Sequence, residues 1–404
     1  MIFYVILSQK SLTAINRLKM DLENKIYFGE ACKSQTKKIL IQSNYHPESF
    51  GGIEAVVLSL IKLLSDFDAK IKCIYFDNYS SHTKKNNIEY FSIKIIMKIF
   101  GAPIGLFGNA KLIKNGRKVD LIIFQEPMPT LWPAIFILRK IFNKKIIVIV
   151  HLIPDITPWA KSFYSFIRNI VFSGSCWVAT SPPLQQQLNL PSKEKATTIP
   201  LSCPEAIKLD FVMDLPERFV LYFGRLANYK GIDILLQSAL HNPEIPLVIA
   251  GDGLRSSEVK AFKAIHGLEQ VVFLNRTFSE QEKMELIKRC AFLLFPSTTR
   301  NEAFGIIQIE AMREGKPIIN TDLKNGVNFV APDKICAMTV RPNSSEDLAA
   351  AINDLWYDDA KILKLGTASR QRYFELFTED KFFNSWRKIF NNFFGLKNRN
   401  QKIK

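Results

Sequence analysis

Short apolar segments alternate with amphipathic segments along most of the chain. The first series of strands that this pattern predicts is Lys38–Ser43, Ile71–Phe76, Leu121–Gln125, Ile146–Val150 and Trp177–Thr180. Residues between them recur with the period of a helix and predict helices at Gly52–Leu64, Trp132–Phe142 and Ser162–Phe172. Strands that alternate with helices are typical of βαβ units, so we expect a parallel sheet covered by helices.

A second series of the same kind follows. Its expected strands are Phe219–Phe223, Leu247–Ala250, Val271–Leu274, Phe292–Phe295 and Pro317–Asn320, and a last helical stretch covers Glu379–Phe394. The stretch between the two series has no clear period and contains Pro204 and Pro216, as a connection between domains does. We therefore expect an N-terminal extension at 1–36, a Rossmann-like domain at 37–202, a linker at 203–218, a second Rossmann-like domain at 219–378, and a final helix with a basic tail at 379–404.

Length, composition and charge narrow the class of protein. A chain of 404 residues is too long for one core, and its hydrophobic fraction of 47% and charged fraction of 23% are ordinary for ordered domains. Of the net charge of +16, residues 1–210 carry +12, from 27 Lys and Arg against 15 Asp and Glu. Such a field attracts nucleic acid, acidic membrane or a charged sugar. The aromatic residues follow the core pattern rather than a base-stacking platform, so we do not expect nucleic acid as a partner.

Metal sites, disulfides and membrane spans find no support in the sequence. The six cysteines show no C-x-x-C spacing, and no two of the five histidines lie close together, so a reducing compartment fits best. No apolar run is long enough to cross a bilayer. The first ten residues resemble a signal core but lack a positive n-region and a small-residue cleavage site, and Met20 is an alternative start. We expect a cytoplasmic protein, peripheral on the inner face of the membrane, without a metal or cofactor.

Glycines and cations follow the first two strands of the second series, where open parallel sheets bind ligands. Gly224 and Arg225 come directly after the first strand, and Lys230 follows five residues later. The two cations near a helix start suit a diphosphate that leaves with growing negative charge. Two surface cations beside a turn would give the same local pattern. Gly253, after the next strand, is expected near the ligand, although a structural turn explains it equally well.

The most informative segment is Phe295–Gly315, FPSTTRNEAFGIIQIEAMREG. A polar loop leads to Glu302, and an apolar helix carries Glu310 about two turns in. Both carboxylates then lie at the same end of the sheet, where one is expected to accept sugar hydroxyls and the other ribose hydroxyls. A capping loop and a solvated glutamate are the structural alternative, which explains Glu302 better than Glu310. The amides expected to open this helix and face the ligand are those of Phe304, Gly305 and Ile306.

The first domain offers fewer signals. Gly51 and Gly52 follow its first strand and precede a helix, which permits close backbone approach to a phosphate. His151 directly follows a strand and is expected to donate a hydrogen bond into the cleft; a satisfied structural histidine is the alternative. Asp66 and Asp68 form a D-x-D triplet, but it follows a helix and precedes a strand, at the edge opposite to ligands, so we interpret it as a solvated turn.

These features together resemble the GT-B glycosyltransferases of family 4. The matching motifs are GRLANYKG at 224–231, LVIAGDG at 247–253, FPSTTRNEAFGIIQIEAM at 295–312 and GKPIIN at 315–320, in the family's order. The resemblance covers about residues 38–395. RNEAFGIIQIEAM and LKNGVNFV are similar to bacterial mannosyltransferases of surface-polysaccharide assembly.

The resemblance implies an α/β GT-B fold, with two facing Rossmann-like domains and a C-terminal helix that crosses back to the first. It implies a retaining, metal-independent transferase that moves a hexose, mannose being favoured, from a nucleotide-diphosphate sugar to a lipid-linked or glycan acceptor. The resemblance implies that Arg225 and Lys230 bind the diphosphate and that Glu310 binds the ribose. It implies that Glu302 binds the donor sugar together with the amides of Phe304 to Ile306. Gly51 and Gly52 would close on the phosphates, and His151 would contact the sugar near the reacting carbon. Two departures are Leu152–Pro154 between His151 and Asp155, and Cys336–Met338 where the family usually has a Gly-Leu pair.

Three other classes of protein share parts of this pattern. A dehydrogenase needs G-x-G-x-x-G after a strand, and the first domain has only Gly51 and Gly52 there. A nucleotide-sugar epimerase has the same architecture but releases a free epimerised product. The third class, a non-catalytic binding relative, has no need to keep the candidate set Arg225, Lys230, Glu302 and Glu310 together.

Two stretches of the first domain, Ile93–Lys118 and Trp132–Lys145, mix cations with large apolar residues. A basic amphipathic helix lies readily in a membrane interface. We therefore expect the first domain to rest on an anionic membrane surface. Ordinary core packing with solvated lysines is the alternative.

Overall fold

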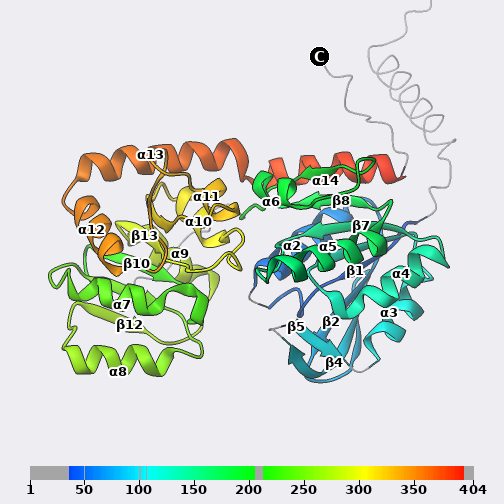
Figure 1. Ribbon diagram of the computed structural model, residues 1–404, viewed down its shortest axis with the longest axis horizontal. Helices are drawn as coiled ribbons and strands as arrows, with labels where there is room; N and C mark the ends of the chain where they lie inside the picture. Colours follow the sequence, from blue (N-terminus) through cyan, green and yellow to red (C-terminus); the bar gives the residue numbers. More distant parts are fainter. Residues whose placement is uncertain (1–35, 50, 100–101, 106, 205–212, 395–404) are drawn as a thin grey trace, which may run out of the picture.

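The computed structural model describes residues 36–49, 51–99, 102–105, 107–204 and 213–394. The expected N-terminal extension before residue 36, the basic tail from 395 and the middle of the expected linker lie outside these residues. Two α/β domains lie side by side (Figure 1), an N-terminal domain up to residue 204 and a C-terminal domain from residue 213.

The N-terminal domain is built on a sheet with the strand order β3-β4-β2-β1-β6-β7-β8-β9. Its parallel strands include β1 (Lys38–Gln42), β2 (Lys70–Asp77), β6 (Leu121–Glu126), β7 (Lys145–Val150), β8 (Cys176–Ala179) and β9 (Ala196–Thr198). The register pairs Ile39 with both Ile71 and Leu121. The connecting helices are α2 (Gly52–Ser65), α3 (Gly108–Gly116), α4 (Trp132–Lys140), α5 (Pro158–Phe172) and α6 (Pro182–Gln187). Strands that are buried on both faces are near-continuous apolar runs, which is why the pattern predicted them.

The edge of this sheet differs from the expectation. Strand β4 (Ile88–Ile99) pairs parallel with β2, and antiparallel with β3 (His82–Lys85) and β5 (Ala102–Gly105). The stretch Ile93–Lys118, which was expected to face a membrane, contains strands as well as α3. Ile93 and Leu112 are fully buried, as is most of Trp132 in the other stretch. The alternation of apolar residues in β4 is the signature of a strand rather than of a helix.

The C-terminal domain has a parallel sheet in the order β12-β11-β10-β13-β14-β15, the order of a Rossmann sheet. Its strands are β10 (Val220–Phe223), β11 (Leu247–Ala250), β12 (Val271–Leu274), β13 (Phe292–Phe295), β14 (Ile318–Thr321) and β15 (Ala337–Val340). The helices are α7 (Ile232–Leu240), α8 (Ser256–His266), α9 (Glu280–Arg289), α10 (Ile306–Arg313), α11 (Gly326–Val330), α12 (Ser345–Trp356) and α13 (Asp359–Leu376). Both domains thus have the expected α/β architecture.

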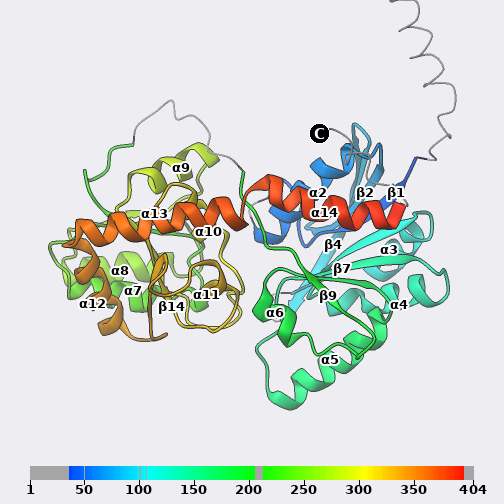
Figure 2. The same ribbon diagram turned by 90° about the horizontal axis from the view of Figure 1, so that it is seen from above.

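The last helix, α14 (Glu379–Phe394), returns to the N-terminal domain and lies along it (Figure 2). Its Arg387 Nη2 lies 3.0 Å from Asp66 Oδ2, and the rings of Phe390 and Phe67 pack edge to face at 5.8 Å. This crossing explains Asp66 and Phe67: the D-x-D triplet is a turn that receives α14. The expected return of the C-terminal helix is confirmed.

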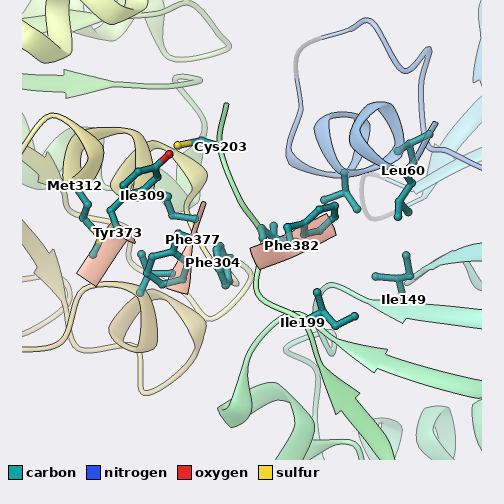
Figure 3. Packing of buried hydrophobic residues seen from close by; sticks show 14 of the residues in the cluster. Leu60, Ile149, Ile199, Cys203, Phe304, Ile309, Met312, Tyr373, Phe377 and Phe382 are labelled. Atoms are coloured by element: carbon teal, nitrogen blue, oxygen red, sulfur yellow. The ribbon is translucent and has the colours of Figure 1, made fainter. Parts of the chain in front are cut away.

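One apolar cluster runs continuously between the domains. Figure 3 shows Ile149 and Ile199 of the N-terminal domain and Ile309 and Phe377 of the C-terminal domain on either side of Phe382, which belongs to α14. Burial of this apolar surface stabilises the pairing of the domains. Among the described residues no helix has the length and apolar character of a membrane span.

Candidate active site

Lys230 and Glu302 are neighbours at the carboxyl end of the C-terminal sheet. Lys230 ends a 3₁₀ turn (Asn228–Lys230), and Gly231 after it adopts a left-handed conformation with φ 69°. A Cβ atom on Gly231 would collide with the carbonyl oxygen of Pro296, so this glycine lets the turn pack against the end of β13. The ammonium group of Lys230 consequently donates to the carboxylate of Glu302, and the two side chains are only 16% and 11% exposed.

Glu310 is buried in α10 and forms an ion pair with a lysine. Lys283 Nζ, from α9, lies 2.7 Å from Glu310 Oε1 and 2.8 Å from a carboxylate oxygen of Glu280. Burial raises the pKa of the Glu310 carboxyl, and the ammonium of Lys283 acts against that rise. The sequence analysis missed Lys283, because the segment that carries it is an ordinary amphipathic helix with a capping box at Ser279 and Glu282. A lysine in the first turn of that helix was the available signal.

The start of α10 faces the start of α2 across the boundary between the domains. Gly305 caps α10 with φ 79°, and a Cβ atom there would lie 2.5 Å from the ring of Phe295. The first amides of a helix have no acceptor within the helix, so those of Phe304, Gly305 and Ile306 remain at this end. On the other side, a Cβ atom on Gly52 would lie 3.5 Å from Ile306 Cδ1. The structure therefore brings Gly52 to the helix start that the sequence assigned to the sugar nucleotide.

Gly51, Arg225 and Glu54 lie near the same boundary. Gly51 is the N-cap residue of α2, and a Cβ atom on it would collide with the carboxylate of Glu54. Glu54 is buried and accepts a hydrogen bond from the backbone N–H of Tyr45 at 3.0 Å. Burial raises the pKa of Glu54, and the charge of Arg225 in the other domain opposes this rise. The exposed Arg225 guanidinium is thus close enough to α2 to act on its first turn.

Gly253 has a structural explanation. Its φ is 153°, and a Cβ atom on it would lie 2.5 Å from the carbonyl oxygen of Leu226. The loops after β10 and β11 therefore approach each other as closely as backbone allows. This contact accounts for the glycine without a ligand.

His151 follows β7 and ends a chain of polar side chains. His151 Nε2 lies 2.7 Å from Gln125 Oε1, and the backbone N–H of Gln125 donates to Gln42 Oε1 at 2.9 Å. The three residues stand at the ends of β7, β6 and β1, next to one another in the sheet. Burial lowers the pKa of His151 to about 4, so the ring is neutral near pH 7 and acts as a hydrogen-bonding group. Neither glutamine was expected at the site, since a lone Gln at a strand end carries no spacing signal.

His151 also lines a pocket between the two domains. The polar residues around it are His151, Asp155, Lys161 and Gln187 of the N-terminal domain, and Arg300 and Asn325 of the C-terminal domain. The backbone N–H of Asp155 donates to Asn301 Oδ1 at 3.4 Å, which ties the loop after His151 to the other domain. A cation from each domain borders this pocket. Among the described residues, no group of three His, Cys, Asp or Glu side chains is placed to hold a metal ion.

Comparisons with known proteins agree with this geometry. Residues 206–372 match the family described as Glycosyl transferases group 1. O-antigen chain mannosyltransferase C of Escherichia coli is 26% identical over 86% of this chain and 95% of its own length. D-rhamnosyltransferase WbpZ of Pseudomonas aeruginosa is 25% identical over 83% of this chain and 90% of its own length.

Solved structures share the whole fold. Sucrose-phosphate synthase of Thermosynechococcus elongatus aligns with a TM-score of 0.73 and 18% identity, over 89% of this chain and 100% of that one. Anabaena Alr3699/HepE in complex with UDP-glucose aligns with a TM-score of 0.67 and 18% identity, over 88% of this chain and 99% of that one. The expected GT-B fold is confirmed, and the chain is a GT-B protein whose residues 206–372 match the glycosyl transferases of group 1.

Proposed function

We propose that this protein is a retaining, metal-independent glycosyltransferase that moves a hexose, mannose being favoured, from a nucleotide-diphosphate sugar to a lipid-linked or glycan acceptor in surface-polysaccharide assembly. The observation that carries the proposal is the meeting of Lys230, Glu302, the start of α10 and Gly52 at one boundary between two domains. The relatives named for O-antigen mannosyl and rhamnosyl transfer support the substrate class.

In the proposed reaction, Lys230 and Arg225 hold the diphosphate. A buried ion pair such as Lys230–Glu302 neutralises both charges while the site is empty. When the diphosphate binds, its oxygens compete for the ammonium group, and Glu302 gains the freedom to accept hydroxyls of the donor sugar. The amides at the start of α10 add donors to the same region.

Glu310 is proposed to accept the ribose hydroxyls of the nucleotide. A carboxylate does this best when it is ionised, and burial alone disfavours the ionised form. The ammonium of Lys283, 2.7 Å away, supplies the compensating charge. We therefore assign Lys283 as a positioning residue for Glu310.

Chemistry at the sugar is proposed to proceed on one face. The bond from the anomeric carbon to the diphosphate breaks, the acceptor oxygen bonds to the same carbon on the same face, and the departing phosphate takes the acceptor proton. Positive charge on Lys230 and Arg225 meets the charge that grows on the leaving group. The neutral ring of His151 contacts the sugar as a hydrogen-bonding group rather than as an acid.

The pocket beside His151 is proposed to admit the acceptor. Lys161 and Arg300 give it a cation from each domain, which suits an acceptor with an anionic linkage such as a diphosphate. A lipid-linked acceptor would keep the enzyme on the inner face of the cytoplasmic membrane, as a peripheral protein.

A donor screen with product analysis tests the proposal. The purified protein is incubated with GDP-mannose, UDP-glucose and other sugar nucleotides, with and without a polyprenyl-diphosphate acceptor, and the anomeric configuration of the product is read by NMR. Transfer with the donor's configuration is the expected result. Inverted product would overturn retention, free epimerised sugar nucleotide would favour the epimerase alternative, and thermal stabilisation without turnover would favour a non-catalytic relative.

A further inference from the structure

Helix α5 exposes a stripe of large apolar side chains. Four of its residues lie on the outer face with high exposed fractions: Trp159 at 76%, Phe163 at 63%, Phe166 at 61% and Ile170 at 43%. We propose that this α5 stripe docks onto a membrane surface that contains acidic lipid, with the helix lying in the interface beside the acceptor pocket. The inference deepens the proposed function, because it gives a lipid-linked acceptor a defined route to the site.

The α5 stripe is continuous along the helix. Its members are spaced by four, three and four residues, which places them on one side of an α-helix. The opposite side packs on the N-terminal domain through Ser165, Arg168, Val171 and Phe172, all buried. The helix therefore has one side that packs on the domain and one apolar side that is uncovered.

The uncovered surface extends beyond α5. Ile156, two residues before the helix, is 43% exposed, and Ile141 after α4 is 70% exposed. Helices α4 and α5 pack against each other. A row of exposed apolar side chains such as the α5 stripe is rare on a monomer and marks an interaction site.

Charge identifies the partner as an acidic lipid surface. Residues 132–172, from the start of α4 to the end of α5, hold five Lys and Arg besides the buried Arg168, against a single acid, Asp155. Helix α5 itself contains no acidic residue. Aromatic side chains with cations around them are the composition of helices that lie in the interface of an anionic membrane. In this proposal the exposed Lys140 and Lys145 meet lipid headgroups, while the rings enter the acyl boundary.

Lys161 connects the surface to the site. It lies between Trp159 and Phe163 in the sequence of α5, and its side chain also lines the pocket with His151. One helix thus borders both the proposed lipid surface and the proposed acceptor pocket. An acceptor whose lipid chain stays in the bilayer would meet the pocket at its anionic linkage.

Vesicle cosedimentation tests the docking surface. The full chain should bind vesicles of phosphatidylcholine with about one third phosphatidylglycerol, and binding should fall steeply with added salt. The double variant Phe163→Ser/Phe166→Ser should lower the partition coefficient about tenfold or more, since two large side chains no longer enter the bilayer. The matched control Ile265→Ser/Leu363→Ser removes two exposed apolar side chains of the C-terminal domain, 77% and 72% exposed, and should bind as the wild type does.

Tryptophan emission gives a second measurement. Trp159 is far more exposed than Trp132, Trp177 and Trp386, which are buried. Its emission should shift to the blue on acidic vesicles, and the Trp159→Phe variant should lose that shift. Unchanged vesicle binding of the Phe163/Phe166 variant, or a wild type that ignores acidic vesicles and instead forms dimers that this variant dissolves, would overturn the proposal.

Transfer to a water-soluble acceptor separates this inference from the proposed function. The Phe163→Ser/Phe166→Ser variant should keep soluble transfer at the wild-type rate while it loses vesicle binding. Vesicle binding without transfer to any acceptor would overturn the proposed function alone. Transfer by a wild type that binds no acidic vesicle would overturn the docking surface alone.

Discussion

The ammonium group of Lys230 donates to the carboxylate of Glu302, although 71 residues separate the two in the chain. Each side chain is the charged partner of the other at the proposed sugar-nucleotide site. A ligand with two phosphate groups must therefore rearrange this pair when it binds. Removal of the Lys230 ammonium group should lower turnover more than it weakens binding of the donor, because the negative charge of the leaving group grows only as the bond breaks.

Lys230→Ala should lower turnover by about 10²–10³-fold, the effect of removing one preorganised donor. Steady-state kinetics with a saturating donor measure it, and a thermal melt shows whether the variant is folded. Lys361→Ala is the matched control, since Lys361 forms an exposed pair with Asp354 in the same domain and should leave turnover unchanged. Near-wild-type turnover in folded Lys230→Ala would remove Lys230 from the proposed mechanism.

Glu310→Gln and Glu302→Gln should separate nucleotide binding from sugar recognition. Glu310→Gln should weaken binding of the free nucleoside diphosphate about tenfold or more, because the proposed partner of Glu310 is the ribose. The second should leave that affinity near wild type and reduce discrimination among donor sugars. Calorimetry with nucleoside diphosphate alone compares them, and equal losses in both variants would contradict the assignment.

Lys283→Met should weaken binding of the same nucleotide, because it removes the positive charge beside Glu310. Burial then raises the pKa of Glu310 with less opposition, so a larger share of the carboxyl is protonated. The loss of affinity should grow as the pH falls, whereas Glu310→Gln should weaken binding equally at all pH values. Calorimetry between pH 6 and 8 distinguishes the two, and a pH-independent loss in Lys283→Met would show that Lys283 acts through another contact.

His151 should make the stability of the protein depend on pH. Its pKa falls from about 6.5 in the unfolded chain to about 4 in the fold, so below pH 6.5 the unfolded state binds the extra proton. The free energy of unfolding should therefore fall as the pH drops from about 6.5 to 4, by up to about 3 kcal/mol from this residue. Urea denaturation across this range should give a flatter profile for His151→Gln, while His266→Gln, at an exposed site, should follow the wild type. Parallel profiles for wild type and His151→Gln would contradict the assigned burial effect.

Activity should survive a chelator, because Lys230 and Arg225 already supply positive charge to the diphosphate. Donor turnover is compared before and after treatment with EDTA, and after addition of Mg²⁺ or Mn²⁺. The D-x-D triplet gives no reason to expect a metal, since Asp66 pairs with Arg387 of α14. Complete loss that either metal restores would show that the diphosphate needs more charge than the two side chains provide.

Local pattern in the sequence was sufficient for most of the fold. Strands β11 and β13 match the expected ranges Leu247–Ala250 and Phe292–Phe295, because a strand buried on both faces is a short apolar run between turn residues. The predicted ends of the helices were less accurate. Helix α5 begins at Pro158 rather than Ser162, because proline suits the first turn of a helix even where the apolar period is weak.

Some residues of the candidate site could also be predicted from the sequence, and others could not. Glycines, cations and glutamates at strand ends were visible in the sequence because parallel sheets bind ligands at that edge. The structure places Gly52 against the start of α10, and pairs Lys230 with Glu302 and Lys283 with Glu310. Lys283 and Gln125 were not visible. Their partners lie 27 and 26 residues away, and only the packing of α9 on α10 and of β6 beside β7 brings them together.

The sequence by itself determined which segments alternate between strand and helix, and which residues stand at strand ends, because both follow from local period and order. Only the tertiary structure decided which polar groups pair across elements, and which apolar faces remain uncovered. The α5 stripe shows the reason. An apolar face has the same period whether it packs on a sheet or meets a membrane, and its exposure depends on what the rest of the chain places against it.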